Sequence, residues 1–195
     1  MLKQLLAKVQ SRILRHARLS YCCTNESLEA VVAGLAPNET DSVLSVGGSG
    51  DQAFALLEYT GQVKIAETEK AQLAYIQRRI ELLSQGNYRR FLEITLHSYF
   101  CPNPVNAAKE HLERRKAYFT KQRFERIRSR LPSIQLLPRI DLFQAIKKIQ
   151  GLTKVYLSNA LEYGRRLEDF SSHIVLDQIS QNLQQGSLIY VSNHD

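Results

Sequence analysis

The sequence has few of the features that identify a whole class of protein directly. Its three cysteines are an adjacent pair, Cys22 and Cys23, and a distant Cys101. This pattern suits neither a disulfide framework nor a zinc site, and it indicates thiols in a reducing cytoplasm. No run of about eighteen apolar residues is present, which argues against a membrane-spanning helix. The dinucleotide spacing G-x-G-x-x-G and the lysine of a phosphate-binding P-loop are also absent.

What is present is the length and composition of one globular domain. The chain has 195 residues, of which 44% are hydrophobic and 23% charged, enough for a single domain with a sizeable core. The net charge of +7 is unevenly spread. Residues 1–18 carry five cations and no acid, and residues 109–130 carry nine cations and three acids. These two segments therefore bear the basic surface, and the rest of the chain is mildly acidic.

The N-terminal 40 residues predict two helices. Residues 1–18 alternate apolar and basic positions at helical spacing, as in helices that lie on a membrane surface and, faintly, in transit peptides. We favour the alternative of a helix that caps the sheet and exposes its basic face. No cleavage-site pattern is visible, so we expect the mature protein to keep this segment. A second helix over 25–35 would be capped by Thr24 or Asn25.

Residues 41–72 predict a strand, a glycine-rich turn, a helix, a second strand and an acid at its end. Gly47, Gly48 and Gly50 follow the apolar strand, and Asp51 opens the helix. Glycines let a backbone turn sharply and approach a ligand closely. Glu67, about twenty residues further on, could accept hydrogen bonds from a ribose diol. The alternative is a tight strand-to-helix connection with no ligand.

Strands and helices alternate through most of the chain, which predicts a Rossmann-like α/β fold. The sheet would be mostly parallel, with helices on both faces. We expect one domain over 1–195, with N-terminal helices in 1–40 and a nucleotide-binding core in 41–85 and 132–195. Residues 86–131 would be a basic helical insertion, with a short helix to about 99 and one long helix from about 106. The later strands are expected at 133–137, 154–157 and 187–191, and later helices at 142–149 and 167–183.

Ligands of such sheets bind beyond the carboxyl ends of the strands, where several polar residues are expected to meet. Each has a simpler explanation on its own, since Asp51 and Asp141 could cap helices and Asn159 could form a turn. Their shared edge is what those explanations do not predict. The residues concerned are Gly47–Asp51, Glu67, Asp141, Ser158, Asn159, Asn193 and His194.

Part of the sequence resembles the S-adenosylmethionine-binding core of the 3-amino-3-carboxypropyltransferases of betaine-lipid synthesis. The similar segments are VLSVGGSGDQAFALL, VKIAETEKAQLAYIQ and VYLSNALEYG, with YCCTNESLEAV as a diverged entry segment. The family's uncharged first-strand residue is matched by Ser45 and its small-Gly-Asp turn by Ser49-Gly50-Asp51. Its Asn-Pro-Ala-Gln motif corresponds here to Glu69-Lys70-Ala71-Gln72. Glu67 replaces an aspartate, the tryptophan of the entry motif is absent, and the last antiparallel strand pair of methyltransferase-like sheets is not evident.

The resemblance implies a class I methyltransferase-like fold, S-adenosylmethionine as cofactor, and a role for each residue at the edge. Gly47, Gly48, Ser49, Gly50 and Asp51 would approach the methionine and ribose, and Glu67 would hold the ribose hydroxyls. Asp141 would face the adenine amino group, and Ser158 and Asn159 would lie near the sulfonium. A base for a lipid hydroxyl acceptor would come from His194, Tyr163 or Glu162.

Two functions follow from these observations. The first is an S-adenosylmethionine-dependent transferase that moves a 3-amino-3-carboxypropyl or methyl group to a small-molecule or lipid acceptor. The second is a non-catalytic methyltransferase-like module whose basic helices engage a membrane, an RNA or a partner protein. The cations of 109–130 fit a solvated insertion, an anionic membrane surface or, third, nucleic acid. We expect a cytoplasmic protein that could associate peripherally with a membrane, and an oligomer could complete the sheet edge.

Overall fold

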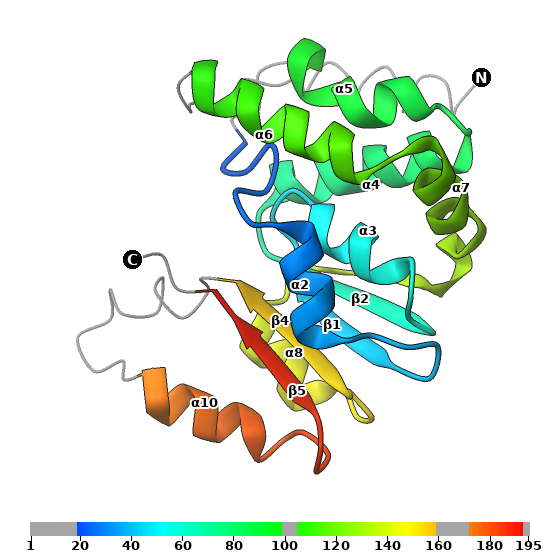
Figure 1. The fold of residues 1–195 in the computed structure, drawn as a ribbon. Coiled ribbons are helices and arrows are strands. Elements are labelled where there is room, and N and C mark those ends of the chain that lie inside the picture. Colours follow the sequence, from blue (N-terminus) through cyan, green and yellow to red (C-terminus); the bar gives the residue numbers. More distant parts are fainter. Residues whose placement is uncertain (1–18, 99–104, 159–171, 193–195) are drawn as a thin grey trace, which may run out of the picture.

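The computed structural model describes residues 19–98, 105–158 and 172–192. Its centre is a five-stranded sheet in the order β3-β2-β1-β4-β5, in which every neighbouring pair is parallel (Figure 1). The strand order reverses between β1 and β4, as in doubly wound Rossmann-like folds. The predicted fold class is confirmed. The strands are β1 (Ser42–Val46), β2 (Gln62–Glu67), β3 (Ile134–Pro138), β4 (Lys154–Ser158) and β5 (Leu188–Val191).

Helices cover both faces of the sheet because side chains of each strand alternate between the two faces. Val43 joins the core cluster beneath α2 (Leu28–Leu35), α3 (Asp51–Leu57) and α4 (Lys70–Ser84). Leu44 joins the opposite cluster with α8 (Leu142–Lys148) and α10 (Ser172–Ser180). Both residues are fully buried, so β1 has the near-continuous apolar character of a central parallel strand.

The predicted helical insertion forms three helices in its described part, not two. They are α5 (Tyr88–Ser98), α6 (Val105–Tyr118) and α7 (Lys121–Ser129), followed by a short 3-10 turn, η1 (Leu131–Ser133). The expectation of one long helix from about residue 106 was wrong. The chain breaks at Phe119 and Thr120, where the Thr120 hydroxyl accepts from the Arg123 amide at 3.3 Å and caps α7.

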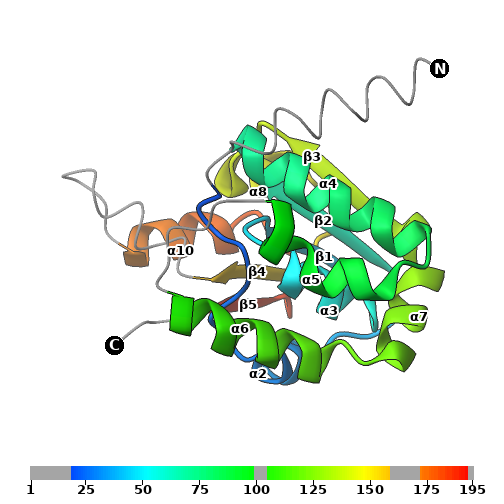
Figure 2. The same ribbon diagram turned by 90° about the horizontal axis from the view of Figure 1, so that it is seen from above.

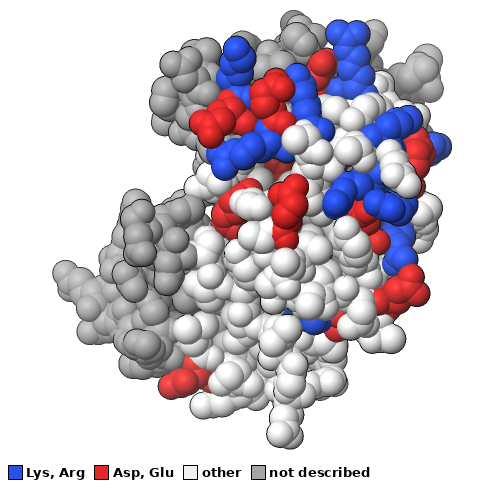
Figure 3. All heavy atoms as spheres, viewed as in Figure 1, with Lys and Arg blue, Asp and Glu red and all other residues white. Residues whose placement is uncertain are grey.

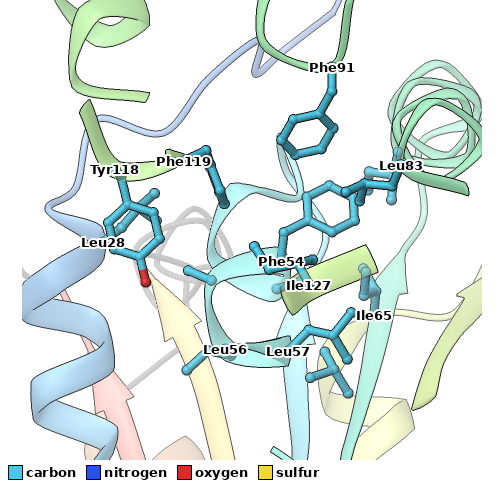
Figure 4. Close-up of a cluster of buried hydrophobic side chains, with 14 of the residues drawn as sticks. Leu28, Phe54, Leu56, Leu57, Ile65, Leu83, Phe91, Tyr118, Phe119 and Ile127 are labelled. Atoms are coloured by element: carbon cyan, nitrogen blue, oxygen red, sulfur yellow. The ribbon is translucent and has the colours of Figure 1, made fainter. Parts of the chain in front are cut away.

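Aromatic rings attach this insertion to the Rossmann-like core. Phe91 of α5 makes edge-on contacts with Phe54 of α3, with Phe119 and with Phe124, at centroid distances of 5.4–5.5 Å. Figure 4 shows Phe91 and Phe119 directed toward Phe54. The break at Thr120 brings Phe119 and Phe124 to the same ring, which one straight helix would not do. Figure 2 shows α4, α5 and α6 together on the viewer's side of the sheet.

Two further boundaries differ from the sequence predictions. The helix expected over 25–35 begins at Leu28, and Ser27 is its cap because the Ser27 hydroxyl accepts from the Ala30 amide. Thr24 and Asn25, the predicted caps, precede the helix in an irregular segment. Of the helix expected over 167–183, the structure describes α10, Ser172–Ser180. Residues 159–171 lie outside the described residues. Within the described ranges, no helix is both long and apolar enough to cross a membrane.

Candidate functional site

The glycine turn after β1 lies against the end of β2. The Gly47 amide donates to the Ala66 carbonyl at 2.8 Å, and the Gly50 amide to the Gly47 carbonyl at 2.8 Å. A Cβ at Gly47 would lie 2.5 Å from Glu67 Oε2, so this position needs glycine. Gly48 has a φ of +48°, and a Cβ there would meet nothing within 4 Å. The turn is therefore packed on the acid of β2 and presents Gly48 to open space.

Glu67 fastens this turn to β2. Its Oε2 accepts from the Gly48 amide at 3.0 Å, and its Oε1 accepts from the amides of Thr68 at 2.8 Å and Glu69 at 2.9 Å. Burial raises the pKa of this carboxyl above its ordinary value, against the opposing effect of the three amides. A carboxylate has about four acceptor positions, so one remains for a hydroxyl of a ligand.

The carboxylate of Asp51 is held between two arginines. Its side chain is fully buried, with Oδ1 2.6 Å from Arg79 Nη1 and Oδ2 2.9 Å from Arg115 Nη2. Burial opposes ionisation, but the charges of Arg115 and Arg79 hold the pKa at about 2. Ser49 points the same way, since its hydroxyl donates to Asp51 Oδ2 at 2.9 Å. In this structure the side chains of Ser49 and Asp51 therefore pack the turn, and their contact with the methionine and ribose portions stays a prediction.

This arrangement predicts a loss of stability in acid. The folded-state pKa of Asp51 is about 2 against an ordinary 3.8, so its ionised form stabilises the fold above pH 3.8, and that contribution is lost as the pH falls toward 2. The free energy of unfolding should fall by roughly 2 kcal/mol over this window. The raised pKa of Glu67 acts above about pH 4.5. The pKa of Glu125, lowered chiefly by its hydrogen bond to Lys121, acts below pH 4.5 in the wild type and in Asp51→Asn alike. Urea unfolding between pH 2 and 5 measures the slope, and an equal slope in Asp51→Asn would contradict the assignment.

Residues 19–27, which we call the strap, cross the carboxyl edge of the sheet. The side-chain amide of Gln72 binds both the Tyr21 amide at 3.2 Å and the Tyr21 carbonyl at 2.9 Å, and it also donates to the Gly48 carbonyl. Further along, the Thr24 amide donates to Asp51 Oδ2 at 3.0 Å. Figure 1 shows the strap running from beside α6 into α2. The strap therefore contacts the glycine turn from outside the sheet.

At its other end the strap delivers Glu26 to the ends of β4 and β5. Glu26 Oε2 accepts from the Tyr156 hydroxyl at 2.5 Å, and Oε1 accepts from the hydroxyls of Ser158 at 2.5 Å and Ser192 at 2.9 Å. The register between β4 and β5 shifts between Tyr156 and Ser158, and Ser158 has a φ of +53°. This bulge at the strand end turns the Ser158 hydroxyl toward Glu26.

The other predicted site residues are placed only in part. Asp141 follows β3 and caps α8, with Oδ1 accepting from the Gln144 amide at 2.9 Å. Asn159, Glu162, Tyr163, Asn193 and His194 lie outside the described residues, so their roles stay predictions. Sequence reasoning missed Glu26, Arg79 and Arg115, which no local pattern marks. Gln72 did carry a signal, because it is the glutamine of the Glu69–Gln72 motif.

The basic run of residues 109–130 is largely paired. Arg115 binds Asp51, and Arg123 and Arg126 both bind the buried carboxylate of Glu58 in the Rossmann-like core, at 3.0 and 2.5 Å. Figure 3 shows the cations of this region interspersed with acids, above a mostly uncharged surface. The pairing fixes α6 and α7 to the rest of the protein. The paired cations are Arg114, Arg115, Lys116, Lys121, Arg123, Arg126, Arg128 and Arg130.

Comparisons with known proteins find similarity only among solved structures. No family model and no curated protein matches the chain. A precorrin-8W decarboxylase of Methanobacterium thermoautotrophicum is 15% identical over 86% of this chain and 62% of its own, with a TM-score of 0.44. The precorrin-6Y C5,15-methyltransferase of Geobacter metallireducens is 9% identical over 88% and 67%, with a TM-score of 0.49.

The glycopeptide N-methyltransferase MtfA, in complex with S-adenosylmethionine, is 12% identical over 95% of this chain and 58% of its own, with a TM-score of 0.44. The chain thus spans about 58–67% of the length of these three structures. At such identities the likeness concerns the fold alone. The strand order itself defines the class, a doubly wound Rossmann-like parallel sheet.

Proposed function

We propose that this protein binds S-adenosylmethionine at the carboxyl edge of its sheet and acts as a transferase. The observation that carries the proposal is the junction of the glycine turn with the acid of the neighbouring strand. Gly48 faces open space, and its amide is bound by Glu67. The junction lies at the end of β1, where the strand order reverses and doubly wound folds bind nucleotides. The choice of S-adenosylmethionine rests on the resemblance of the motifs around this turn.

The residues at this edge fit such a ligand. Gly47 and Gly48 would let the backbone approach it, and the free acceptor position of Glu67 would take one ribose hydroxyl. Asp141 has its second oxygen available for the adenine amino group while the first caps α8. Ser158, with Asn159 next to it, would lie near the sulfonium. Ser49 and Asp51 support the turn from behind.

Transfer from S-adenosylmethionine needs few catalytic groups from the protein. Transfer from a sulfonium releases a neutral leaving group, so placing donor and acceptor in line can supply most of the rate. We infer either methyl or 3-amino-3-carboxypropyl transfer to a small-molecule or lipid acceptor. Calorimetric titration with S-adenosylmethionine tests binding. Mass analysis of products then distinguishes the two reactions, because methyl transfer releases S-adenosylhomocysteine and aminocarboxypropyl transfer releases methylthioadenosine.

Gly48→Ala should weaken the binding of S-adenosylmethionine at least about tenfold, a loss of roughly 1.4 kcal/mol. The added methyl group would enter the open space in which the ligand is proposed to lie. Gly186→Ala is the matched control. Gly186 also has a positive φ, of +87°, and open space around its Cβ, but it precedes β5 at the opposite edge of the sheet.

Both variants should lose about 1 kcal/mol of stability from the strained backbone. Calorimetry of the two proteins therefore separates loss of stability from loss of binding. Equal affinities in Gly48→Ala and Gly186→Ala would remove the glycine turn from the proposed site.

One observation favours the second candidate function, a non-catalytic binding module. The strap contacts the glycine turn through Gln72, and Glu67 already accepts hydrogen bonds from three amides. Both observations are expected if the polar groups at this edge serve packing within the protein and not ligand binding. The basic helices would then engage an anionic membrane, an RNA or a partner protein. Absence of binding to both S-adenosylmethionine and S-adenosylhomocysteine, together with cosedimentation with anionic vesicles, would support this function over the first.

A further inference from the structure

Glu26 is a charged group at the carboxyl edge that packing alone does not explain. It is partly buried, and its carboxylate oxygens accept hydrogen bonds from Tyr156, Ser158 and Ser192. All three donors are neutral hydroxyl groups. Among the described residues, no lysine or arginine forms an ion pair with Glu26, whereas the buried acids Asp41, Asp51 and Glu58 each have one. A partly desolvated carboxylate without a cation is costly to maintain.

The hydroxyl groups hold this carboxylate in one place. Tyr156 is fully buried on the central part of the sheet, and burial and the adjacent Glu26 charge raise its pKa, so it stays a hydrogen-bond donor. Ser158 and Ser192 come from the ends of neighbouring strands, β4 and just after β5. Glu26 lies on an irregular segment, but these three donors from the sheet hold its side chain in place.

The position of Glu26 relates it to the proposed cofactor. The strand order reverses between β1 and β4, and Glu26 is bound at the end of β4 while the glycine turn lies at the end of β1. The central strand β1 (Ser42–Val46) contains no charged residue. Its Ser45 is fully buried, and the Ser45 hydroxyl donates to the Val46 carbonyl. The strap thus brings a second carboxylate to this edge, at the end of β4, in addition to Glu67 at the end of β2.

We propose that Glu26 recognises the positive charge of the donor, either its sulfonium or its α-ammonium group. This inference rests on the proposed function and adds to it the residue that selects a cationic ligand. A sulfonium has no N–H or O–H group to donate, so a nearby carboxylate would attract it through its charge and not through a directed hydrogen bond. An ammonium group would in addition donate to the Glu26 oxygens, in a charge-assisted hydrogen bond.

The test is calorimetric titration of the wild-type chain, Glu26→Gln and Glu29→Gln with S-adenosylmethionine and S-adenosylhomocysteine. Glutamine keeps one acceptor oxygen, enough for the Ser158 and Ser192 hydroxyls that Oε1 binds, and removes the charge. Glu29 is the matched control, an exposed acid in the first turn of α2 whose carboxylate accepts a hydrogen bond from the Ser27 hydroxyl. We expect Glu26→Gln to bind S-adenosylmethionine about ten- to a hundredfold more weakly, and Glu29→Gln to bind it as the wild type does.

S-adenosylhomocysteine identifies the charge that is recognised, because it has the ammonium group and lacks the sulfonium. An equal loss for both ligands indicates the ammonium group, and a loss confined to S-adenosylmethionine indicates the sulfonium. Binding by Glu26→Gln within about twofold of the wild type, or an equal loss in Glu29→Gln, would overturn the proposal and leave the proposed function standing. A wild-type chain that binds neither ligand would remove both. Thermal unfolding of each variant shows whether it is folded under the titration conditions.

Discussion

Asp51→Asn is expected to lower the free energy of unfolding by about 3–5 kcal/mol. The substitution removes the carboxylate that lies between the guanidinium groups of Arg79 and Arg115, both of which are almost completely buried. Two cations would then face each other in the interior without a counter-charge. Breaking one partner of a buried ion pair costs far more than the pair contributes net, because the remaining charge stays desolvated. Urea or guanidinium unfolding of the variant measures the effect.

The matched control for this prediction is Asp141→Asn. Asp141 is half-buried and caps α8 through one oxygen, and asparagine caps a helix about as well as aspartate. The control should therefore change stability by no more than about 0.5 kcal/mol. A similar small loss in Asp51→Asn would show that the ion-pair cluster is open to water in solution.

Phe91→Ala should cost about 3–5 kcal/mol, the range for truncating a fully buried phenylalanine. Phe91 is the ring at which α5, α3 and the α6–α7 break meet. It also lies under the Arg79 guanidinium, whose central carbon is 4.3 Å from the ring centroid. The substitution leaves a cavity and removes this cation–π contact, so it weakens the attachment of the insertion to the core.

Denaturant unfolding followed by far-UV circular dichroism measures this loss. Tyr88→Phe is the reference variant for the size of the loss. It keeps the ring against Phe124 and removes the hydrogen bond from the Tyr88 hydroxyl to the Phe119 carbonyl at 2.8 Å. We expect that variant to lose about 1 kcal/mol. If Phe91→Ala lost no more than Tyr88→Phe, the aromatic cluster would not be what joins the two parts.

The fold could be predicted from the sequence because its signals are local. Apolar strands separated by amphipathic helices determine a parallel sheet, and glycines followed by Asp51 locate the turn after β1. The break at Thr120 was missed because residues 106–129 keep good helix formers on both sides of it. The cause of the break is tertiary, since Phe119 and Phe124 both pack on Phe91.

The site was less predictable, because its contacts join distant parts of the chain. Asp51 was expected at the ligand, yet its partners Arg79 and Arg115 lie 28 and 64 residues away. Glu26 reaches Ser158 across 132 residues, and neither residue has a pattern that points to the other. By contrast, Gly47 directly follows β1 and Glu67 is the last residue of the adjacent β2, so their proximity follows from strand order.

The ion pair between Arg115 and Asp51 limits which substitutions and deletions related sequences can tolerate. Helices α5, α6 and α7 are inserted between α4 and β3, but Arg115 of α6 neutralises Asp51, the first residue of α3. Excising residues 99–118 would leave Asp51 with a single counter-ion and the Cys22 carbonyl without Arg115. Relatives with a shorter connection at this point should therefore also differ at position 51, and substitutions at 51 and 115 should be inherited together.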